Sequence, residues 1–321
     1  MGSVSHTLTL KRGHILRHGP SKGAQGREAA LIDVAQDLLL RALSDAGVLE
    51  LVTFKGGTAL RKVLAGASGR FSTDLDFSVA NMETNPQQVL ELILEAIDGL
   101  SAGPFRYGIQ ERRGRAHITY ANDLGFETGE LSSKLDVGPP PWLPTTQQAW
   151  VPLPIHNEYG GPLPLLPVVR IEENIAEKIA RLNRRTFARD MYDLIWLAQK
   201  PRLDLDQALI RRLAVLKCWV DKNGLASEHH SWNQIGDARE LDVERWLRPR
   251  TEQSFDDEQI GLLTTPTPHL ADLAADLIAH YIWLRNLDET ETILSAGKAT
   301  DRNSALSQLK ALEGSRLEHV W

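Results

Sequence analysis

The chain has 321 residues, of which 42% are hydrophobic and 24% charged, so it is long enough to bury a sizeable core, split between two domains. Its 36 Lys and Arg residues against 42 Asp and Glu residues give a formal charge of -6, which argues against a surface coated for nonspecific nucleic-acid binding. The single cysteine, Cys218, excludes an internal disulfide framework and fits a reducing compartment. No apolar stretch approaches the roughly 18 to 20 residues of a membrane-spanning helix, so we expect a cytoplasmic protein without a membrane partner.

The segment 1–27 is a basic arm without acidic residues. Its cations are Lys11, Arg12, Arg17, Lys22 and Arg27. Two interpretations stay open, a solvated terminus and a strap that contacts phosphates. From residue 28 onward, apolar residues recur at helical spacing as far as Leu43, and Gly47 marks the end of the predicted helix.

A short apolar run at 49–54 predicts a buried strand. A glycine turn follows this run. The turn consists of Lys55, Gly56, Gly57 and Thr58. The spacing of residues 59–64 then predicts a helix. A strand, a glycine turn and a helix N-terminus together form a geometry that suits phosphate binding.

Residues 74–79 alternate between polar and apolar, which predicts a strand with one solvated face. Asp74 and Asp76 would project from the same face and bind a divalent metal together. Such a pair is common on protein surfaces, but here it follows the glycine turn and Ser72. The turn amides and the Thr58 hydroxyl can hold a triphosphate, while the two carboxylates hold the metal ions that bridge it.

The rest of the first half predicts one helix and three strands. The helix spans 86–100, and the strands cover 105–110, 116–120 and 131–137. The first half is therefore α+β with a small mixed sheet. Proline and glycine at 138–168 predict a crossover, beyond which the chain is mainly α-helical. The helices are expected near 171–182, 192–196, 203–220, 268–287 and 301–313.

The run from Gly56 to Val63, followed by GRFSTDLDF at 69–77, resembles the nucleotidyltransferase signature of the DNA polymerase β superfamily. More narrowly, it resembles the AbiEii/AbiGii family of toxins, which includes the MenT toxins. IAEKI at 175–179 and RDMYDL at 189–194 resemble later elements of that family, so the resemblance spans about residues 50 to 200. It implies a polymerase β-like core domain at 28–168. A helical domain at 169–321 would complete the active site and bind the acceptor or an antitoxin.

The resemblance also implies roles for individual residues. Lys178 would contact the nucleotide phosphates, and Asp190 would be needed for activity, although Asp190 could instead cap or salt-bridge Arg189 or Arg185. The superfamily needs a third acidic ligand, for which Asp136 is the best candidate, because it alternates with apolar residues in a predicted strand. Asp123 and Glu127 are the runners-up for this position.

The mechanism that follows is two-metal nucleotidyl transfer with Mg²⁺, or Mn²⁺ as the alternative, and an NTP substrate. The metal ligands are Asp74, Asp76 and Asp136. The catalytic residues are these three with Lys178 and Asp190. The nucleotide-binding residues are Lys55, Gly56, Gly57, Thr58, Arg61, Ser72 and Lys178, with Lys62 as a further phosphate candidate.

Two basic groups point to an RNA acceptor in a protein that is acidic overall. The candidate RNA-binding residues are Arg181, Arg184, Arg185, Arg189, Arg112 and Arg113. Both groups could also be solvated faces. The resemblance suggests the 3′ end of tRNA as the acceptor, with Trp142, Trp150 or Tyr107 stacking on a base.

The function expected from these features is a toxin that blocks translation and is neutralised by a cognate antitoxin. Two alternatives stay open. One is nucleotidyl transfer to a small molecule or to a protein hydroxyl. The other is a non-catalytic module that binds nucleotide or RNA.

Overall fold

The structure is a computed structural model that describes residues 8–19, 24–226, 230–249, 268–312 and 314–317. The chain forms two compact units. Among the described residues, the first comprises 8–19, 24–140 and 146–168, and the second comprises 141–145, 169–226, 230–249, 268–312 and 314–317. Lys22 of the basic arm lies outside the described residues.

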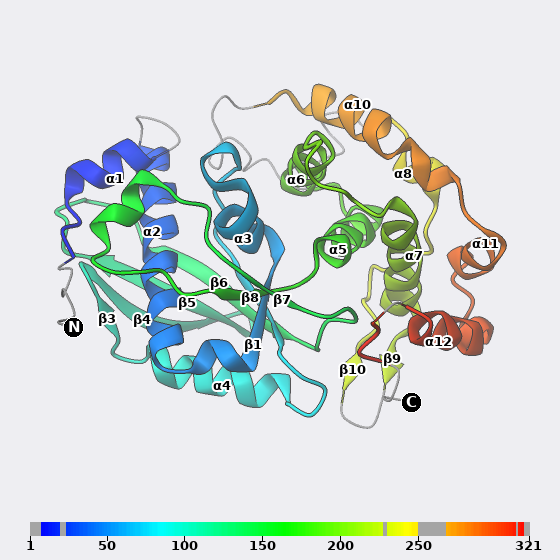
Figure 1. Ribbon diagram of the computed structural model, residues 1–321, viewed down its shortest axis with the longest axis horizontal. Helices are drawn as coiled ribbons and strands as arrows, with labels where there is room; N and C mark the ends of the chain where they lie inside the picture. The colour runs from blue at the N-terminus through cyan, green and yellow to red at the C-terminus, as the bar shows by residue number, and fades with distance from the viewer. Residues whose placement is uncertain (1–7, 20–23, 227–229, 250–267, 313, 318–321) are drawn as a thin grey trace. The chain divides into compact units, whose positions relative to one another are not determined.

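The first unit contains an eight-stranded sheet in the order β3-β4-β5-β6-β2-β1-β8-β7 (Figure 1). The strands are β1 (Val52–Lys55), β2 (Leu75–Val79), β3 (Ser101–Ala102), β4 (Phe105–Arg112), β5 (Arg115–Asn122), β6 (Leu131–Gly138), β7 (Thr146–Gln148) and β8 (Leu166–Val168). The pairs β2–β6 and β1–β8 are parallel, and the other pairs are antiparallel. The predicted α+β class with a mixed sheet is therefore confirmed.

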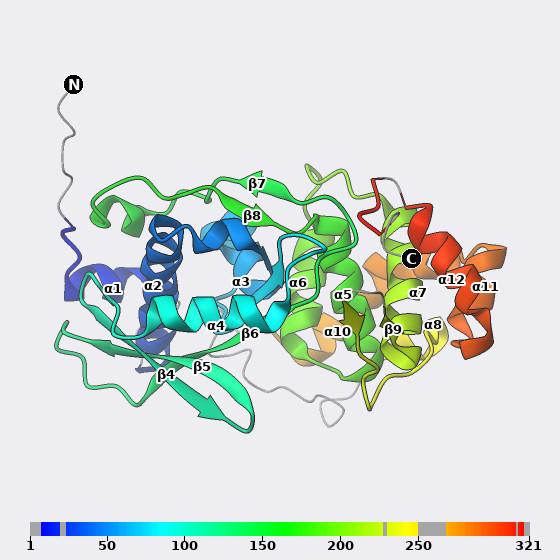
Figure 2. The same ribbon diagram turned by 90° about the horizontal axis from the view of Figure 1, so that it is seen from below.

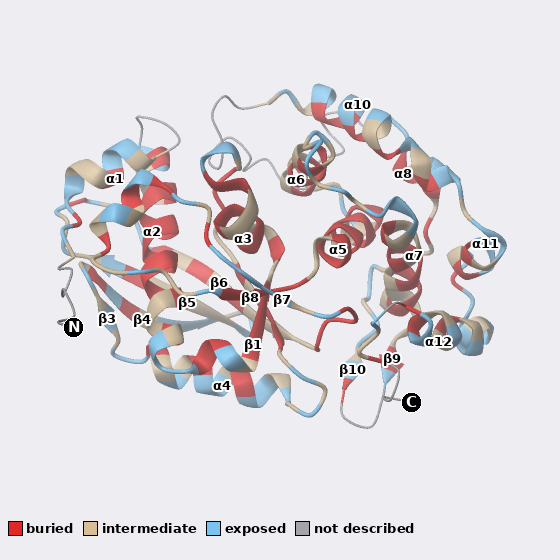
Figure 3. Cartoon of the chain, in the orientation of Figure 1, coloured by how far each residue is buried: buried red, intermediate tan, exposed pale blue. Residues whose placement is uncertain are grey.

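Helices of this unit pack on the sheet through apolar stripes. They are α1 (Arg12–His18), α2 (Ala24–Asp45), α3 (Gly56–Leu60) and α4 (Pro86–Ile97), with short turns η1 (Val48–Leu51), η2 (Arg61–Ala65), η3 (Gly66–Ser68) and η4 (Pro154–Glu158). α4 begins at Pro86 behind the Asn85 cap, whose side chain accepts a hydrogen bond from the Gln87 amide at 2.8 Å. Its buried face packs on β2, β4 and β6 (Figure 2). α2 is buried along most of its length (Figure 3).

Several predicted elements differ in detail. The run at 49–54 begins as the turn η1, and only Val52–Lys55 pairs with β2, because Gly47 reverses the chain with a φ of 75°. Asp74 lies just before β2 rather than within it. The basic arm contains α1, which is packed through Ile15, and the expected crossover at 138–168 supplies β7 and β8 to the sheet.

The second unit is mainly helical, as predicted. Its helices are α5 (Ile171–Arg184), α6 (Ala188–Ala198), α7 (Gln207–Asn223), α8 (Val243–Trp246), α10 (Leu270–Tyr281), α11 (Glu289–Ser295) and α12 (Arg302–Lys310), with turns η6 (Ile282–Arg285) and η7 (Ala299–Asp301) and a hairpin of β9 (Leu225–Ala226) and β10 (Ser231–Trp232). α5 packs along α7, and Cys218 is buried in α7. Within the described ranges, we find no helix that is both long and apolar enough to cross a membrane.

Candidate active site

Three neighbouring strands of the first unit place Lys55, Asp76 and Asp136 in one row. Lys55 pairs with Asp76 across the antiparallel strands β1 and β2, and Asp76 pairs with Asp136 across the parallel strands β2 and β6. Neighbouring strands lie about 4.8 Å apart, and paired residues project from the same face of a sheet. The second aspartate of the D-x-D pair and the predicted third carboxylate are therefore strand neighbours.

The glycine turn is built against this row. Gly56 has a φ of 76°, which favours glycine, and a Cβ at this position would overlap the Asp76 carboxylate. A Cβ on Gly57 would lie 2.6 Å from the Arg70 guanidinium and 3.1 Å from Ser72 Oγ. Both glycines are thus required for the first turn of α3 to approach the segment that carries Ser72 and Asp76.

Thr58 makes a structural contact in this turn. Its hydroxyl donates a hydrogen bond to the Asp74 carbonyl oxygen, and the residue is 1% exposed. Ser72 is 6% exposed beside Gly57. The structure thus brings the predicted phosphate-binding residues of the turn and the D-x-D segment together, with the Thr58 hydroxyl engaged on the backbone.

The donor chemistry of this region fits a divalent cation, because Asp74, Asp76 and Asp136 offer carboxylate oxygens, which Mg²⁺ prefers. Asp136 is paired with the Lys134 ammonium, and it would have to exchange this partner for an ion. Among the described residues, no group of three or more His, Cys, Asp or Glu side chains is arranged to hold a metal ion. The two other candidates for the third carboxylate are not strand neighbours of Asp76. Asp123 pairs with Arg106 at 2.7 Å, and Glu127 is exposed.

Arg61, a predicted nucleotide ligand, lies inside the first unit. Its guanidinium donates hydrogen bonds to the carbonyl oxygens of Gly66 and, at 3.1 Å, of Gly69, and it lies 4.2 Å from the centre of the Phe71 ring. It also pairs with Asp33 at 3.4 Å. These contacts fix the segment between the glycine turn and Ser72.

Asp33 is the centre of a buried charge cluster that sequence reasoning missed. Lys62 Nζ lies 2.5 Å from both Asp33 and Asp37, and His18 Nε2 lies 2.7 Å from Asp33. Burial alone would raise the pKa of Asp33, but Lys62 and Arg61 hold it well below its usual value. The sequence contains one feature that could have revealed this cluster. Asp33 and Asp37 stand four residues apart among the apolar residues of α2, so they share one face of the helix.

The second unit brings its two predicted motifs together. Lys178 of α5 is 1% exposed, and its ammonium lies 3.1 Å from Asp190 and 2.8 Å from Asp193, both on α6. Arg181 Nε contacts the other oxygen of Asp190 at 3.1 Å. Asp193 was missed, although it stands in the same R-D-x-Y-D-L element as Asp190.

The predicted RNA-binding arginines mostly have acidic partners. Arg184 lies 3.7 Å from Asp221, Arg185 lies 2.7 Å from Asp237, and Arg112 lies 2.7 Å from Glu130. Arg189 covers the Phe187 ring at 5.2 Å, and Arg113 occupies the hairpin turn with a φ of 53°. The local positive charge is therefore smaller than the sequence run suggests.

The expected base stacking on three aromatic residues is wrong. Trp142 is 0%, Trp150 is 7% and Tyr107 is 5% exposed, because all three rings pack in the cores of their units. A base could not reach their faces without repacking those cores.

The mixed sheet, the glycine turn against the aspartate row and the helical second unit are the parts of a nucleotidyltransferase. The chain matches the family model described as nucleotidyl transferase AbiEii toxin, type IV toxin–antitoxin system, over residues 37–278. It is similar to the solved structure of MenT4, a nucleotidyltransferase toxin from Mycobacterium tuberculosis, with 36% identity, a TM-score of 0.81, and coverage of 94% of this chain and 99% of that one. It also matches JHP933 from Helicobacter pylori at 19% identity and a TM-score of 0.44, covering 84% of this chain and 97% of that one. The search of curated proteins found no match.

The chain therefore belongs to the AbiEii family of nucleotidyltransferase toxins. It is a nucleotidyltransferase toxin of a type IV toxin–antitoxin system, which implies an NTP substrate and an antitoxin partner. The family generally uses a divalent metal.

Proposed function

We propose that this toxin transfers a nucleoside monophosphate from an NTP to the 3′ hydroxyl of an RNA, with tRNA as the acceptor. The observation that carries the proposal is the row of Lys55, Asp76 and Asp136 beside the glycine turn. An acceptor hydroxyl attacks the α-phosphorus and a new O–P bond forms. The bond to the bridging oxygen breaks, pyrophosphate leaves with the electron pair, and the hydroxyl proton is released.

Each element of the first unit has a role in this proposal. Asp74, Asp76 and Asp136 would hold Mg²⁺, which when bound would neutralise phosphate charge and make the acceptor hydroxyl easier to deprotonate. Gly56 and Gly57 allow the first amides of α3 to approach the phosphates. Lys55, on the strand next to Asp76, adds positive charge at the same face.

Lys178 supplies a further phosphate contact, and Asp190 and Asp193 orient its ammonium. Positioning and charge stabilisation account for most of the catalysis in such transfers, so no covalent nucleophile is required. Arg61 has a different role, because its guanidinium is occupied by Gly66, Gly69 and Asp33. Arg61 positions the segment that carries Ser72.

Incubation of the purified protein with each labelled NTP, Mg²⁺ and total RNA tests the proposal. We expect label in the tRNA fraction, and a loss of at least about 10³-fold in the rate for Asp76→Asn, because transition-state charge would lose its counterion. Absence of labelled RNA with every NTP would contradict the proposal. Preferential labelling of an aminoglycoside or a protein hydroxyl in a competition would favour the alternative acceptors.

The third carboxylate has a matched control within the chain. Asp136→Ala removes a strand neighbour of Asp76, while Asp123→Ala removes an exposed carboxylate that also forms an ion pair with a basic residue of the same sheet. We expect Asp136→Ala to lower the rate by about 10²-fold or more, because a metal ligand would be lost. Asp123→Ala should stay within about twofold, since exposed ion pairs contribute little. Equal rates for the two variants would remove Asp136 from the site.

A further inference from the structure

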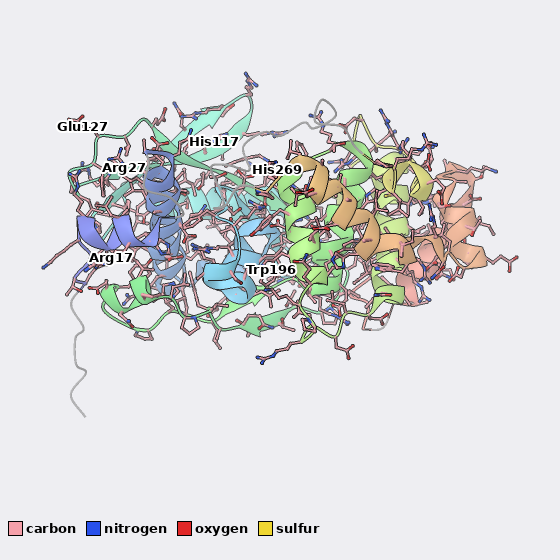
Figure 4. The ribbon with its side chains drawn as sticks, turned by 90° about the horizontal axis from the view of Figure 1, so that it is seen from above. Arg17, Arg27, His117, Glu127, Trp196 and His269 are labelled. Atoms are coloured by element: carbon pink, nitrogen blue, oxygen red, sulfur yellow. The ribbon has the colours of Figure 1, made fainter. Side chains whose placement is uncertain are left out.

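The face of the sheet that carries Asp76 continues outward across β6, β5 and β4. Asp136 and Lys134 stand two residues apart on β6 and share this face with Asp76. Lys134 pairs with His117 of β5, and His117 pairs with Gln110 of β4. Figure 4 labels His117 on this part of the sheet. We call this surface the outer sheet face.

The outer sheet face is polar, whereas the opposite side of the same strands is core. On β5 and β6 the residues of the core side, Ile118, Tyr120, Leu131 and Leu135, are at most 4% exposed. Their neighbours on the outer sheet face are partly exposed. These are His117, Thr119, Ser132, Lys134 and Asp136. Antiparallel strands commonly have one solvated face, and these side chains are on it, open to a ligand.

A hollow lies at the far end of this face from Asp76. Gly108 of β4 pairs with Thr119 of β5, and a Cβ on Gly108 would come within 2.8 Å of Thr119 Oγ1. Thr119 also lines a cavity of about 440 Å³, together with Ala121, Phe126 and Glu130 among others. This volume falls within the range of pockets that hold small organic ligands. It is large enough for one nucleotide.

The outer sheet face carries cations whose partners can be exchanged. Arg106, Arg112 and Lys134 form ion pairs with Asp123, Glu130 and Asp136, and Arg115 adds a fourth positive charge. Both members of the Arg112–Glu130 pair are exposed, at 38% and 54%. Exposed pairs contribute little to stability, so phosphates can replace these carboxylates at small cost. Lys134 is released in particular when Asp136 serves as a metal ligand.

We propose that the outer sheet face binds the single-stranded end of the acceptor RNA and leads it to Asp76 and Asp136. Arg112, Arg115 and Lys134 contact its phosphates, and the cavity beside Thr119 and Glu130 accepts one unpaired nucleotide. This inference rests on the proposed RNA acceptor and specifies where it lies. The cavity is separated from Asp136 by at least four residues of β6, about 13 Å, so it serves an upstream nucleotide of the acceptor rather than the reacting end.

Salt-dependent binding tests the charge part of the proposal. A labelled RNA single strand of about 12 nucleotides, within the range of single-strand sites, is titrated with full-length protein without NTP and at one fixed Mg²⁺ concentration, over a series of KCl concentrations. Each phosphate contact contributes about 0.7 to the slope of log affinity against log salt. We expect Arg112→Ala and Lys134→Ala each to reduce the slope by about 0.7. Slopes equal to that of the wild type in both variants would overturn the proposal.

The matched control is Arg285→Ala in the second unit. Arg285 forms an ion pair with Glu244 at 2.7 Å, with side chains 47% and 64% exposed, so it resembles the Arg112–Glu130 pair in geometry and exposure. This variant should keep the wild-type slope. A loss of slope equal to that of Arg112→Ala would show that any surface arginine contributes, which would also overturn the proposal.

Filling the cavity tests the nucleotide subsite separately. Ala121 is exposed in β5, where an aromatic residue is tolerated, so Ala121→Phe occupies the cavity without disturbing the core. We expect about tenfold weaker binding at every salt concentration with an unchanged slope, because the substitution alters the shape of the cavity but not the charge of the surface. Unchanged affinity would overturn the subsite.

Binding is measured without nucleotide transfer, so the proposed RNA-binding surface and the proposed transfer reaction can each be contradicted without the other. Labelled RNA with unchanged slopes would leave the proposed function standing and remove the outer sheet face from it. Reduced slopes without any labelled RNA product would retain the binding surface and overturn the proposed function.

Discussion

Each unit of the protein contains a buried cluster of opposite charges, but the two differ in access to solvent. In the first unit, the side chains of Asp33, Asp37, Arg61 and Lys62 are between 0% and 3% exposed. In the second unit, Lys178 and Asp190 are equally buried, whereas Asp193 is 8% and Arg181 is 31% exposed. The first cluster is closed by protein, and the second has an open side at Arg181.

This difference in exposure distinguishes cations that stabilise the fold from cations that can bind a substrate. Arg61 and Lys62 follow the glycine turn directly in sequence, yet both are committed to carboxylates of α2. An NTP could recruit them only by taking the Lys and Arg partners from two buried carboxylates, which costs several kcal/mol. Lys178 can exchange a partner more cheaply, because Arg181 would still pair with Asp190.

The largest effect is expected from Lys62→Met, which removes the ammonium that the buried carboxylates of Asp33 and Asp37 share. We expect the free energy of unfolding to fall by about 3 to 5 kcal/mol, because both carboxylates lose a fully buried partner. Urea denaturation followed by circular dichroism measures the change. Lys222→Met is the control, since its pair with Glu240 is 35% and 46% exposed and should contribute below about 1 kcal/mol. Similar losses for the two variants would show that the buried ion pairs of the first cluster stabilise the protein no more than an exposed pair does.

A smaller loss of stability is expected from Lys178→Met. Arg181 remains at 3.1 Å from Asp190, so we expect the free energy of unfolding to fall by about 2 to 3 kcal/mol, less than in Lys62→Met. Transfer activity should nevertheless fall by about 10²-fold, because the proposed phosphate contact is lost. Activity within twofold of wild type, with the protein folded, would make the second cluster structural as well.

How far the sequence predicts the site depends on the range of the contacts involved. Alternation over a few residues predicts β4, β5 and β6, and apolar spacing with a Pro86 start predicts α4. The glycine turn and the D-x-D pair are predictable for the same reason, because each is a local motif. Asp136 was predicted from the polar face of its strand, and the structure adds that β6 lies directly beside β2.

Contacts between distant residues were beyond prediction. Arg61 is 28 positions from Asp33, and nothing local distinguishes a buried guanidinium from one that binds phosphate. Likewise, Arg184 and Arg185 form part of a basic run, while their partners Asp221 and Asp237 lie in later segments of the chain. Charge runs predict a patch only when the tertiary partners are known.

A pH-dependent effect is expected at Asp221, whose side chain is 21% exposed. Burial raises the pKa of Asp221 to about 6, although Arg184 and Lys217 act in the opposite direction. A carboxyl whose pKa is raised on folding stabilises the protein below about pH 4, and this contribution is lost as the pH rises through 6. Asp221→Asn should therefore gain stability relative to wild type between pH 4 and pH 7, by at most about 3 kcal/mol. Urea denaturation of both proteins across this range measures the difference, and a constant difference would contradict the assigned shift.

The smallest effect is expected where an ion pair is fully open to water. Arg285→Ala removes the pair with Glu244, and we expect almost no change in the free energy of unfolding, because solvent screens the interaction and both side chains regain rotamer freedom. Raising the salt concentration should shrink even this difference, since the Debye length falls to about 3 Å at 1 M. The Lys62→Met loss should persist in high salt, because ions cannot enter the closed cluster. If salt reduced both losses in the same proportion, the first cluster would be accessible to solvent, and Lys62 would again be a candidate for phosphate binding.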